Sequence, residues 1–153
     1  MRLLAFLVLV GAAHAEPLQR KRHDQRHHHD AQTVRGRHTV DAAAVAALGA
    51  ECVTLERLLQ SSDFVVATVL LNEQTHHLMN AERFAQMKRS AYFVNLSRGP
   101  IADEAALIDA LRNRTIAGAG IDVFEQEPVA SDNPLLGMDN VLVTPHALCW
   151  TDE

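Results

Sequence analysis

Three ionisable residues of complementary chemistry each follow a short apolar run, and such a run indicates a β-strand. They are Arg98, Glu127 and His146. An arginine can hold a carboxylate by two parallel hydrogen bonds. A histidine paired with a glutamate has a fixed tautomer and a stabilised imidazolium, so it can donate or accept a proton. Together these residue types suit a substrate with a carboxylate beside a carbonyl or hydroxyl group. The alternative is structural: Arg98 and Glu127 form a salt bridge, and His146 caps a turn.

Such a site requires a fold that brings several strand ends together. From Val40 onward, short apolar runs alternate with segments of helical period, which is the pattern of βαβ units around a parallel sheet. Ligands of these sheets bind beyond the carboxyl ends of the strands, where the three residues fall. The predicted elements are helix 42–48, strand 51–53, helix 55–59, strand 64–69, helix 81–88 after Asn80, strand 92–95, a helix from Asp103 and Glu104 to Arg112, strand 116–123 and strand 141–143.

The composition is that of a globular domain with its own core. The chain has 153 residues and a formal charge of −5, with 48% hydrophobic and 22% charged residues. Two cysteines, Cys52 and Cys149, are too few for a disulfide framework. No apolar run approaches the roughly 18 residues of a membrane-spanning helix, and the acidic balance argues against a nucleic-acid partner. We therefore expect a soluble, cytoplasmic chain with no nucleic-acid or membrane partner, the alternative being export if residues 1–15 form a signal peptide.

The first forty residues differ in charge from the rest. They hold seven basic and three acidic residues, a charge of +4, whereas residues 41–153 hold seven and sixteen, a charge of −9. Residues 1–15 have the charged start, apolar stretch and small-x-small ending of a secretory signal, although their apolar run also suits a buried parallel strand. Residues 16–40 have few apolar side chains and are expected to be disordered. The sequence thus predicts a leader over residues 1–40 and a domain over residues 41–153.

The leader also contains clustered histidines and a short basic run. Clustered imidazoles can bind transition metals, but the consecutive residues His27, His28 and His29 cannot all face one ion from a helix or strand, and no cysteine supports them. We expect no specific metal site. The basic run of residues 20–22 lacks the interleaved aromatic residues of a nucleic-acid site.

Several motifs occur in a fixed order over about residues 48–151. They are LNEQTHHLMN at residues 71–80, NLSRGP at 95–100, DEAAL at 103–107, GAGIDVFEQEP at 118–128, NPLL at 133–136, Asn140-Val141, and TPH at 144–146. This set resembles the family of NAD-dependent D-2-hydroxyacid dehydrogenases, including its branch of C-terminal-binding-protein corepressors. The resemblance implies an oxidoreductase that acts on the CH-OH group of a D-2-hydroxy acid. The residues His76 and His77 match a surface turn in this family and are interpreted as structural.

The resemblance also implies catalytic roles for the three ionisable residues. Arg98 would bind the carboxylate and carbonyl of the substrate, and His146 would supply or remove the proton at the 2-oxygen. Glu127 would orient His146 and raise its pKa, which keeps protonated histidine available for 2-oxo acid reduction.

The cofactor implied by the resemblance is NAD, and the sequence leaves NADP open. Asp122 would hydrogen-bond the nicotinamide carboxamide, while Leu96, Ser97 and Arg98 would line the same cofactor together with His146. The partner would be a small 2-hydroxy or 2-oxo acid, and a homodimer is implied by the resemblance alone.

Part of the family pattern is missing from the sequence. A dinucleotide site uses a G-x-G-x-x-G turn that opens a helix, and the 153 residues contain none, since Gly118-Ala119-Gly120 falls in a predicted strand. Residues 1–6 resemble the family's second strand, which makes residues 7–39 an interruption of the pattern. We therefore expect a partial Rossmann-type, doubly wound parallel sheet that lacks the glycine-loop unit, its central strand and the substrate domain. The alternative function is a non-catalytic NAD-binding or corepressor-like module.

Overall fold

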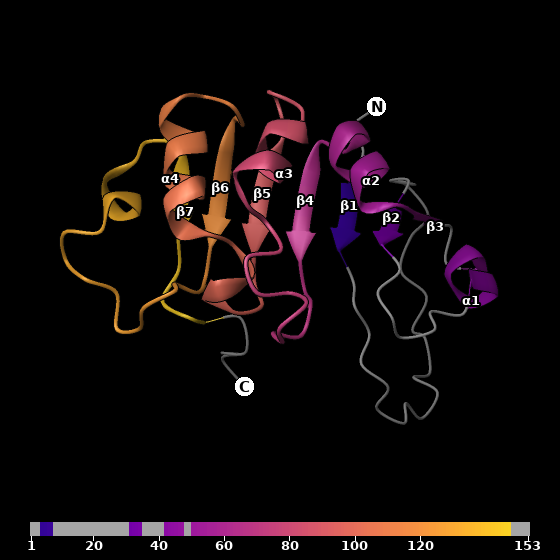
Figure 1. The fold of residues 1–153 in the computed structure, drawn as a ribbon, viewed down its shortest axis with the longest axis horizontal. Coiled ribbons are helices and arrows are strands. Elements are labelled where there is room, and N and C mark those ends of the chain that lie inside the picture. Colours follow the sequence, from indigo (N-terminus) through magenta and orange to yellow (C-terminus); the bar gives the residue numbers. More distant parts are fainter. Residues whose placement is uncertain (1–3, 8–30, 35–41, 48–49, 148–153) are drawn as a thin grey trace, which may run out of the picture.

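The computed structural model of the chain describes residues 4–7, 31–34, 42–47 and 50–147. Its strands are β1 (Leu4–Leu7), β2 (Ala31–Val34), β3 (Ala50–Val53), β4 (Phe64–Ala67), β5 (Tyr92–Asn95), β6 (Gly118–Ile121) and β7 (Val141–Val143). All of them pair in parallel in one sheet, in the order β3-β2-β1-β4-β5-β6-β7 (Figure 1). Strand order reverses between β1 and β4, so the predicted doubly wound parallel sheet is confirmed.

The N-terminal part of the sheet differs from the expectation. Residues 4–7 and 31–34 are strands of the sheet, whereas the sequence predicted a disordered or signal-like leader over residues 1–40. Strand β1 pairs with both β2 and β4 and occupies the central position that was expected to be empty. The second position belongs to β2, not to residues 1–6. The apolar run suits a strand paired along both edges of a parallel sheet. The signal-like cleavage pattern, the basic run and the histidines at 23–29 lie outside the described residues.

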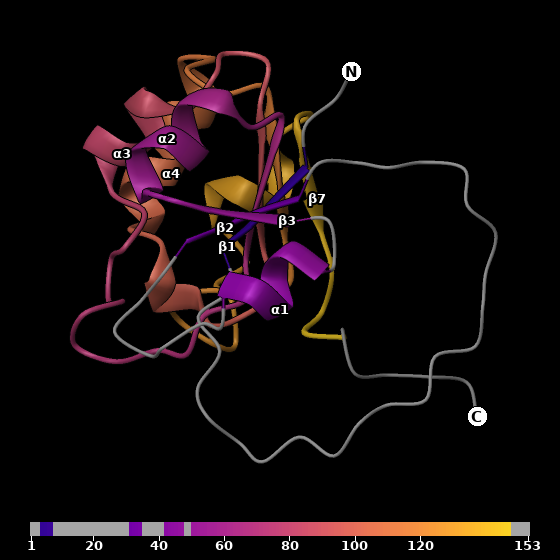
Figure 2. The ribbon, with the colours of Figure 1, turned by 90° about the vertical axis from the view of Figure 1, so that its right-hand side faces the viewer.

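The helices are α1 (Ala42–Ala47), α2 (Leu55–Ser61), α3 (Ala81–Gln86) and α4 (Glu104–Arg112), with single 3₁₀ turns η1 (Gly99–Ile101) and η2 (Pro134–Gly137). Helices α2, α3 and α4 lie on one face of the sheet (Figure 2). Each of them begins at a side chain that accepts a backbone N–H of the first turn. These caps are Thr54 with Arg57, Asn80 with Arg83, and Asp103 with Ala106. The helix starts predicted at Asn80 and Asp103 are confirmed.

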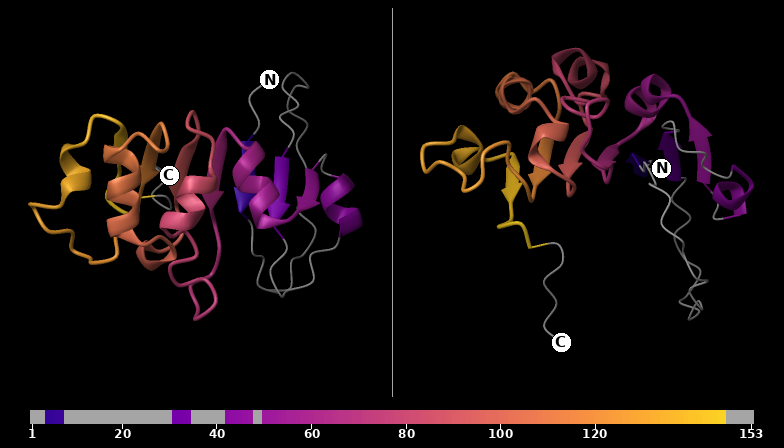
Figure 3. Two further views of the ribbon diagram at one scale, coloured as in Figure 1. Left: turned by 45° about the horizontal axis from the view of Figure 1, so that its top comes forward. Right: turned by 60° about the horizontal axis from the view of Figure 1, so that its bottom comes forward.

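The three helices form a layer along the sheet (Figure 3), and the hydrophobic core is made of side chains from these helices and from β4, β5 and β6. Its largest fully buried side chains include Leu58, Phe84, Phe93, Leu107 and Leu111. The rings of Phe84 and Phe93 meet edge to face with centroids 5.3 Å apart. Each such side chain contributes about 1.5–3 kcal/mol on burial. This packing holds β4, β5 and β6 rigidly, and the polar residues predicted to do chemistry follow the ends of β5 and β6.

The strands are shorter than their apolar runs. Strand β4 ends at Ala67 and not at residue 69, and β6 covers Gly118–Ile121 and not residues 116–123. The common register explains this, because Phe64 to Ala67, Tyr92 to Asn95 and Gly118 to Ile121 stand opposite one another residue by residue. All strands point toward the edge where η1 lies, at the bottom of Figure 1. No helix in the described part of the chain combines the length and the apolar character needed to cross a membrane.

Candidate active site

The loop that carries Arg98 is fixed by the last residue of β5. Asn95 is 2% exposed, accepts the Ser97 N–H at 3.1 Å and donates to the Arg98 carbonyl at 3.0 Å. The Leu96 N–H donates to the Ala67 carbonyl at 3.3 Å, and the Ser97 hydroxyl donates to the Val69 carbonyl. The guanidinium of Arg98 is exposed, and its Nη1 donates to its neighbour's carbonyl, that of Ser97, at 2.7 Å. A rigid turn therefore presents a solvent-accessible arginine.

Gly99 brings this loop directly onto the backbone that follows β6. A Cβ at Gly99 would lie 1.8 Å from the carbonyl oxygen of Phe124 and 2.4 Å from the Glu125 nitrogen. No side chain fits in that space, since real Cβ contacts of this kind lie beyond about 3 Å. The glycine thus lets the arginine loop pack against the residues immediately before Glu127.

Glu127 is held by two different donors. Its Oε1 accepts the backbone N–H of Phe124 at 3.1 Å, and its Oε2 lies 3.1 Å from Nδ1 of His146. The two side chains are 43% and 47% exposed, so a small molecule can reach them. No ion pair between Arg98 and Glu127 occurs in the part of the chain described, so the structural salt bridge considered from the sequence is not formed.

These contacts lower the pKa of Glu127. The backbone N–H of Phe124 has the largest effect because it donates to the charged carboxylate, while partial burial acts in the opposite direction. The hydrogen bond and charge of His146 and the positive charge of Arg98 lower the pKa further. The carboxylate is therefore ionised at neutral pH and can stabilise a positive charge on His146.

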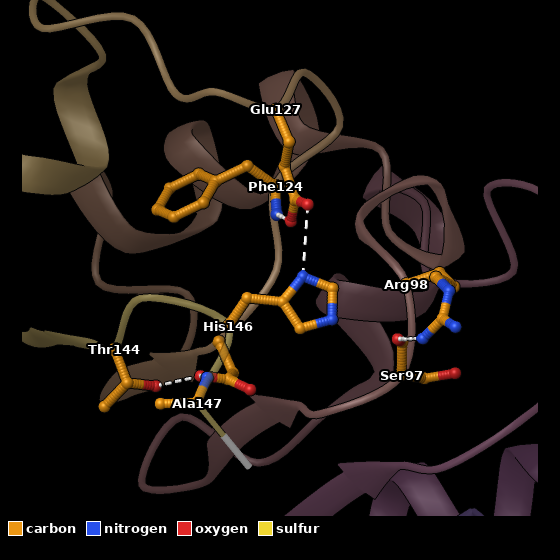
Figure 4. Close-up of polar contacts among 8 residues, drawn as sticks. Ser97, Arg98, Phe124, Glu127, Thr144, His146 and Ala147 are labelled. Carbon is orange, nitrogen blue, oxygen red and sulfur yellow. Dashed lines mark hydrogen bonds and ion pairs between the residues drawn. The ribbon is translucent and has the colours of Figure 1, made fainter. Parts of the chain in front are cut away.

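A buried carboxylate holds the backbone on both sides of His146. Asp122 is 3% exposed, and its Oδ1 accepts the Thr144 hydroxyl at 2.5 Å and the Ala147 N–H at 2.8 Å. These two partners flank His146, whose φ of 55° lies in the left-handed region. The imidazole lies between the Glu127 carboxylate and the Arg98 side chain, with its second ring nitrogen on the Arg98 side (Figure 4).

The structure thus places all the predicted site residues at one edge of the sheet. Leu96, Ser97 and Arg98 follow β5, Asp122 follows β6, and His146 follows β7. Glu127 reaches His146 from the loop after β6. Asp122 bonds Thr144 and Ala147, a contact that the sequence did not predict. Within the described residues, no group of three or more histidine, cysteine, aspartate or glutamate side chains could hold a metal ion.

Sequence reasoning missed the residues that hold the glutamate loop. Glu104 accepts the Glu125 N–H at 3.1 Å, and His77 pairs with the Glu125 carboxylate. The sequence predicts Glu104 only as a residue of the first turn of a helix, and His77 only as part of a surface turn. The contact between His77 and Glu125 joins residues 48 positions apart. No local pattern signals such a pair.

Most of the chain is similar to known proteins. Residues 26–147 match the family model described as "D-isomer specific 2-hydroxyacid dehydrogenase, NAD binding domain". The chain belongs to this family. The match includes residues 26–39, so the prediction that residues 7–39 interrupt the family pattern is wrong for that part. Strand β2 lies within the matched region.

Two curated relatives and one solved structure illustrate the similarity. A glyoxylate reductase of Korarchaeum cryptofilum is 53% identical over 106 residues, covering 69% of this chain and 32% of the relative. A glyoxylate/hydroxypyruvate reductase B of Escherichia coli is 54% identical over 99 residues, covering 65% and 31%. A D-isomer specific 2-hydroxyacid dehydrogenase of Xanthobacter autotrophicus, solved with NADPH and MES, has a TM-score of 0.67 and 44% identity over 76% of this chain and 36% of that one. The chain spans about a third of the length of these relatives.

Proposed function

We propose that this chain acts, as part of an NAD(P)H-dependent reductase, on a small 2-oxo acid and forms the D-2-hydroxy acid. The observation that carries the proposal is the 3.1 Å contact between His146 Nδ1 and Glu127 Oε2 beside Arg98. A proton donor and a carboxylate-binding group at neighbouring strand ends suit reduction of a carbonyl next to a carboxylate. The names of the curated relatives, reductases of glyoxylate or hydroxypyruvate, support the same substrate class.

The residues at this edge fit the nicotinamide end of the cofactor. Asp122 is a buried carboxylate one residue beyond β6, and Leu96, Ser97 and Arg98 follow the adjacent strand β5. A buried carboxylate at that place can accept a hydrogen bond from an amide. When bound, the nicotinamide would supply a hydride to carbon 2 of the substrate. The proposal covers NAD and NADP alike.

The side chains of the chain itself would bind the substrate and move the proton. Arg98 has five N–H donors, of which Nη1 bonds the Ser97 carbonyl, so its planar head can also hold a carboxylate. Glu127 engages the Nδ1 side of His146, which leaves Nε2 as the nitrogen that gives the proton to the 2-oxygen. The ionised Glu127 stabilises the imidazolium before the transfer.

A second candidate is a non-catalytic NAD-binding or corepressor-like module on the same fold. One observation favours the corepressor-like form of this candidate: the 153 residues contain no G-x-G-x-x-G turn, the element that normally holds the pyrophosphate at a helix N-terminus.

A cofactor titration combined with a turnover assay separates the two candidates. The purified chain is titrated with NADH and with NADPH while nicotinamide fluorescence is recorded, and reduction of glyoxylate and hydroxypyruvate is then assayed. We expect binding and turnover, and a loss of about 10²-fold or more in kcat for His146→Ala. The control His76→Ala changes an exposed histidine of the turn before α3. Binding without turnover favours an NAD-binding module, and no binding at millimolar cofactor contradicts the reductase and favours a corepressor-like module.

A further inference from the structure

The segment around His77 runs beside the loop that carries Arg98. The His77 N–H donates to the Pro100 carbonyl at 2.8 Å, and the Met79 N–H donates to the Ile101 carbonyl at 3.0 Å. A parallel bridge joins Met79 to Ala102. The backbone of His77 is thereby attached two residues after Arg98.

The side chain of His77 reaches the other loop of the site. Its Nε2 pairs with Oε1 of Glu125, which precedes Glu127 by two residues. The ring also stacks on His76, with centroids 4.0 Å apart. His77 has a φ of 48°, a left-handed conformation that turns the chain back toward Pro100. One residue therefore connects the arginine loop to the glutamate loop, by its backbone on one side and its imidazole on the other.

Glu125 is also held through its backbone. Its N–H donates to Oε2 of Glu104 at 3.1 Å, and Oε1 of Glu104 accepts from Nδ2 of Asn133 at 2.7 Å. Three carboxylates, those of Glu104, Glu125 and Glu127, thus lie on or against one short loop. Like charges repel, so this loop needs donors at fixed places. The imidazole of His77 supplies one of them for the Glu125 side chain.

We propose that His77 is a positioning residue of the active site, which acts through Glu125 to keep the Glu127 carboxylate in place relative to Arg98. The inference rests on the proposed function, because it assigns a role in that same site. Gly99 sets how closely the two loops approach, and the His77–Glu125 pair prevents the glutamate loop from shifting along the arginine loop. A displaced loop would lose the Phe124 N–H contact to Glu127 that depends on the conformation of residues 124–127.

The test follows the titration of the Glu127 carboxyl by carbon NMR in the full chain without cofactor or substrate. The variants are His77→Asn, Glu125→Ala and the double variant. Asparagine tolerates the left-handed backbone but is too short to keep the contact with Glu125. The matched control is Gln74→Ala, which changes an exposed side chain of the same turn. Amide spectra verify that each variant is folded.

We expect the pKa of Glu127 to rise toward the ordinary glutamate value in both single variants, and no further in the double variant. The control should leave it unchanged. The direction is diagnostic, because removing the negative charge of Glu125 would by itself lower the pKa of a neighbouring carboxyl. The proposal is overturned if the pKa of Glu127 does not rise in one or both single variants. It is also overturned if the rises of the two single variants add up in the double variant. The readout requires no cofactor and no turnover, so failure of the proposed function is recognised separately.

Discussion

Two sets of residues meet at the carboxyl edge of the sheet, and water reaches them to different extents. Asn95, Gly99 and Asp122 are buried: the side chains of Asn95 and Asp122 hydrogen-bond to backbone groups, and Gly99 packs against the Phe124 backbone. The side chains of Arg98 and His146 are exposed to solvent. The two sets therefore have different roles. The buried set holds the loops, so its loss should lower the free energy of unfolding, whereas the exposed set should affect chemistry with little effect on stability.

The largest expected effect is that of Gly99→Ala. The added Cβ would meet the Phe124 carbonyl oxygen at 1.8 Å, and backbone cannot move aside without separating the two loops. We expect a loss of about 3 kcal/mol in the free energy of unfolding, measured by urea denaturation followed by circular dichroism. The control is Gly137→Ala, where nothing lies within 4 Å of the new Cβ. Equal stability of the two variants would show that the loops do not pack as described.

Removal of the buried carboxylate should be the next largest effect. In Asp122→Ala, the Thr144 hydroxyl and the Ala147 N–H lose their acceptor. A buried polar group without a partner costs about 1–3 kcal/mol, and we expect a total loss of about 3 kcal/mol in the same assay. The control Asp132→Ala changes an exposed aspartate and should stay within about 0.5 kcal/mol of wild type. If Asp122→Ala and Asp132→Ala had similar free energies of unfolding, Asp122 would not hold the loops as described.

Asn95→Ala should have an intermediate effect. It removes the bonds to the Ser97 N–H and the Arg98 carbonyl and should cost about 1–2 kcal/mol. Because the turn then releases Arg98, we also expect a higher KM for the 2-oxo acid with a smaller change in kcat. The control Asn113→Ala lies at the exposed C-terminus of α4. A fall in kcat at unchanged KM would contradict the role of Asn95 in holding the arginine.

Glu127→Gln should have the smallest effect on stability and a large effect on turnover. The folded-state pKa of Glu127 lies below its unfolded value, so its ionisation stabilises the fold above the ordinary glutamate pKa, and this stability is lost as the pH falls toward the lowered value. Since the side chain is 43% exposed, solvent screening limits the contribution to about 0.5 kcal/mol or less. Denaturation of wild type and variant from pH 7 to pH 3 measures it. If the variant lost more stability than wild type on acidification, the pKa of Glu127 could not be lowered in the folded state.

Much of the fold near the site could be predicted from local sequence. Asn80 and Asp103 are cap residues whose side chains bond the first turn, and this chemistry needs no distant partner. The strand end that carries Arg98 followed from an apolar run and the rule for parallel sheets, whereas Asp122 was expected inside a strand over residues 116–123 and instead follows its end. The central place of Leu4–Leu7 could not be predicted, because an apolar run does not reveal its neighbours. Strand Ala31–Val34 has too mixed a composition to be recognised as a strand.

The sequence predicts the reactive groups of the candidate site, but not the contacts that hold their loops in place. Arg98, Glu127 and His146 could be proposed from the sequence because their residue types and their positions after predicted strands indicate their chemistry. The pairing of His77 with Glu125 depends on a turn with a positive φ and on how two loops pack. Neither is encoded in a short run of residues. The supporting contacts at this edge therefore required the three-dimensional arrangement.

The contact between Asp122 and the Ala147 N–H also determines how the end of β7 can open. Ala147 is only half-buried, yet its amide proton is held by a carboxylate that is 3% exposed. Exchange of that proton with solvent requires the loop carrying His146 to separate from β6. The exchange rate of a single amide therefore reports how often the histidine leaves its working position, even in a sample that turns over no substrate.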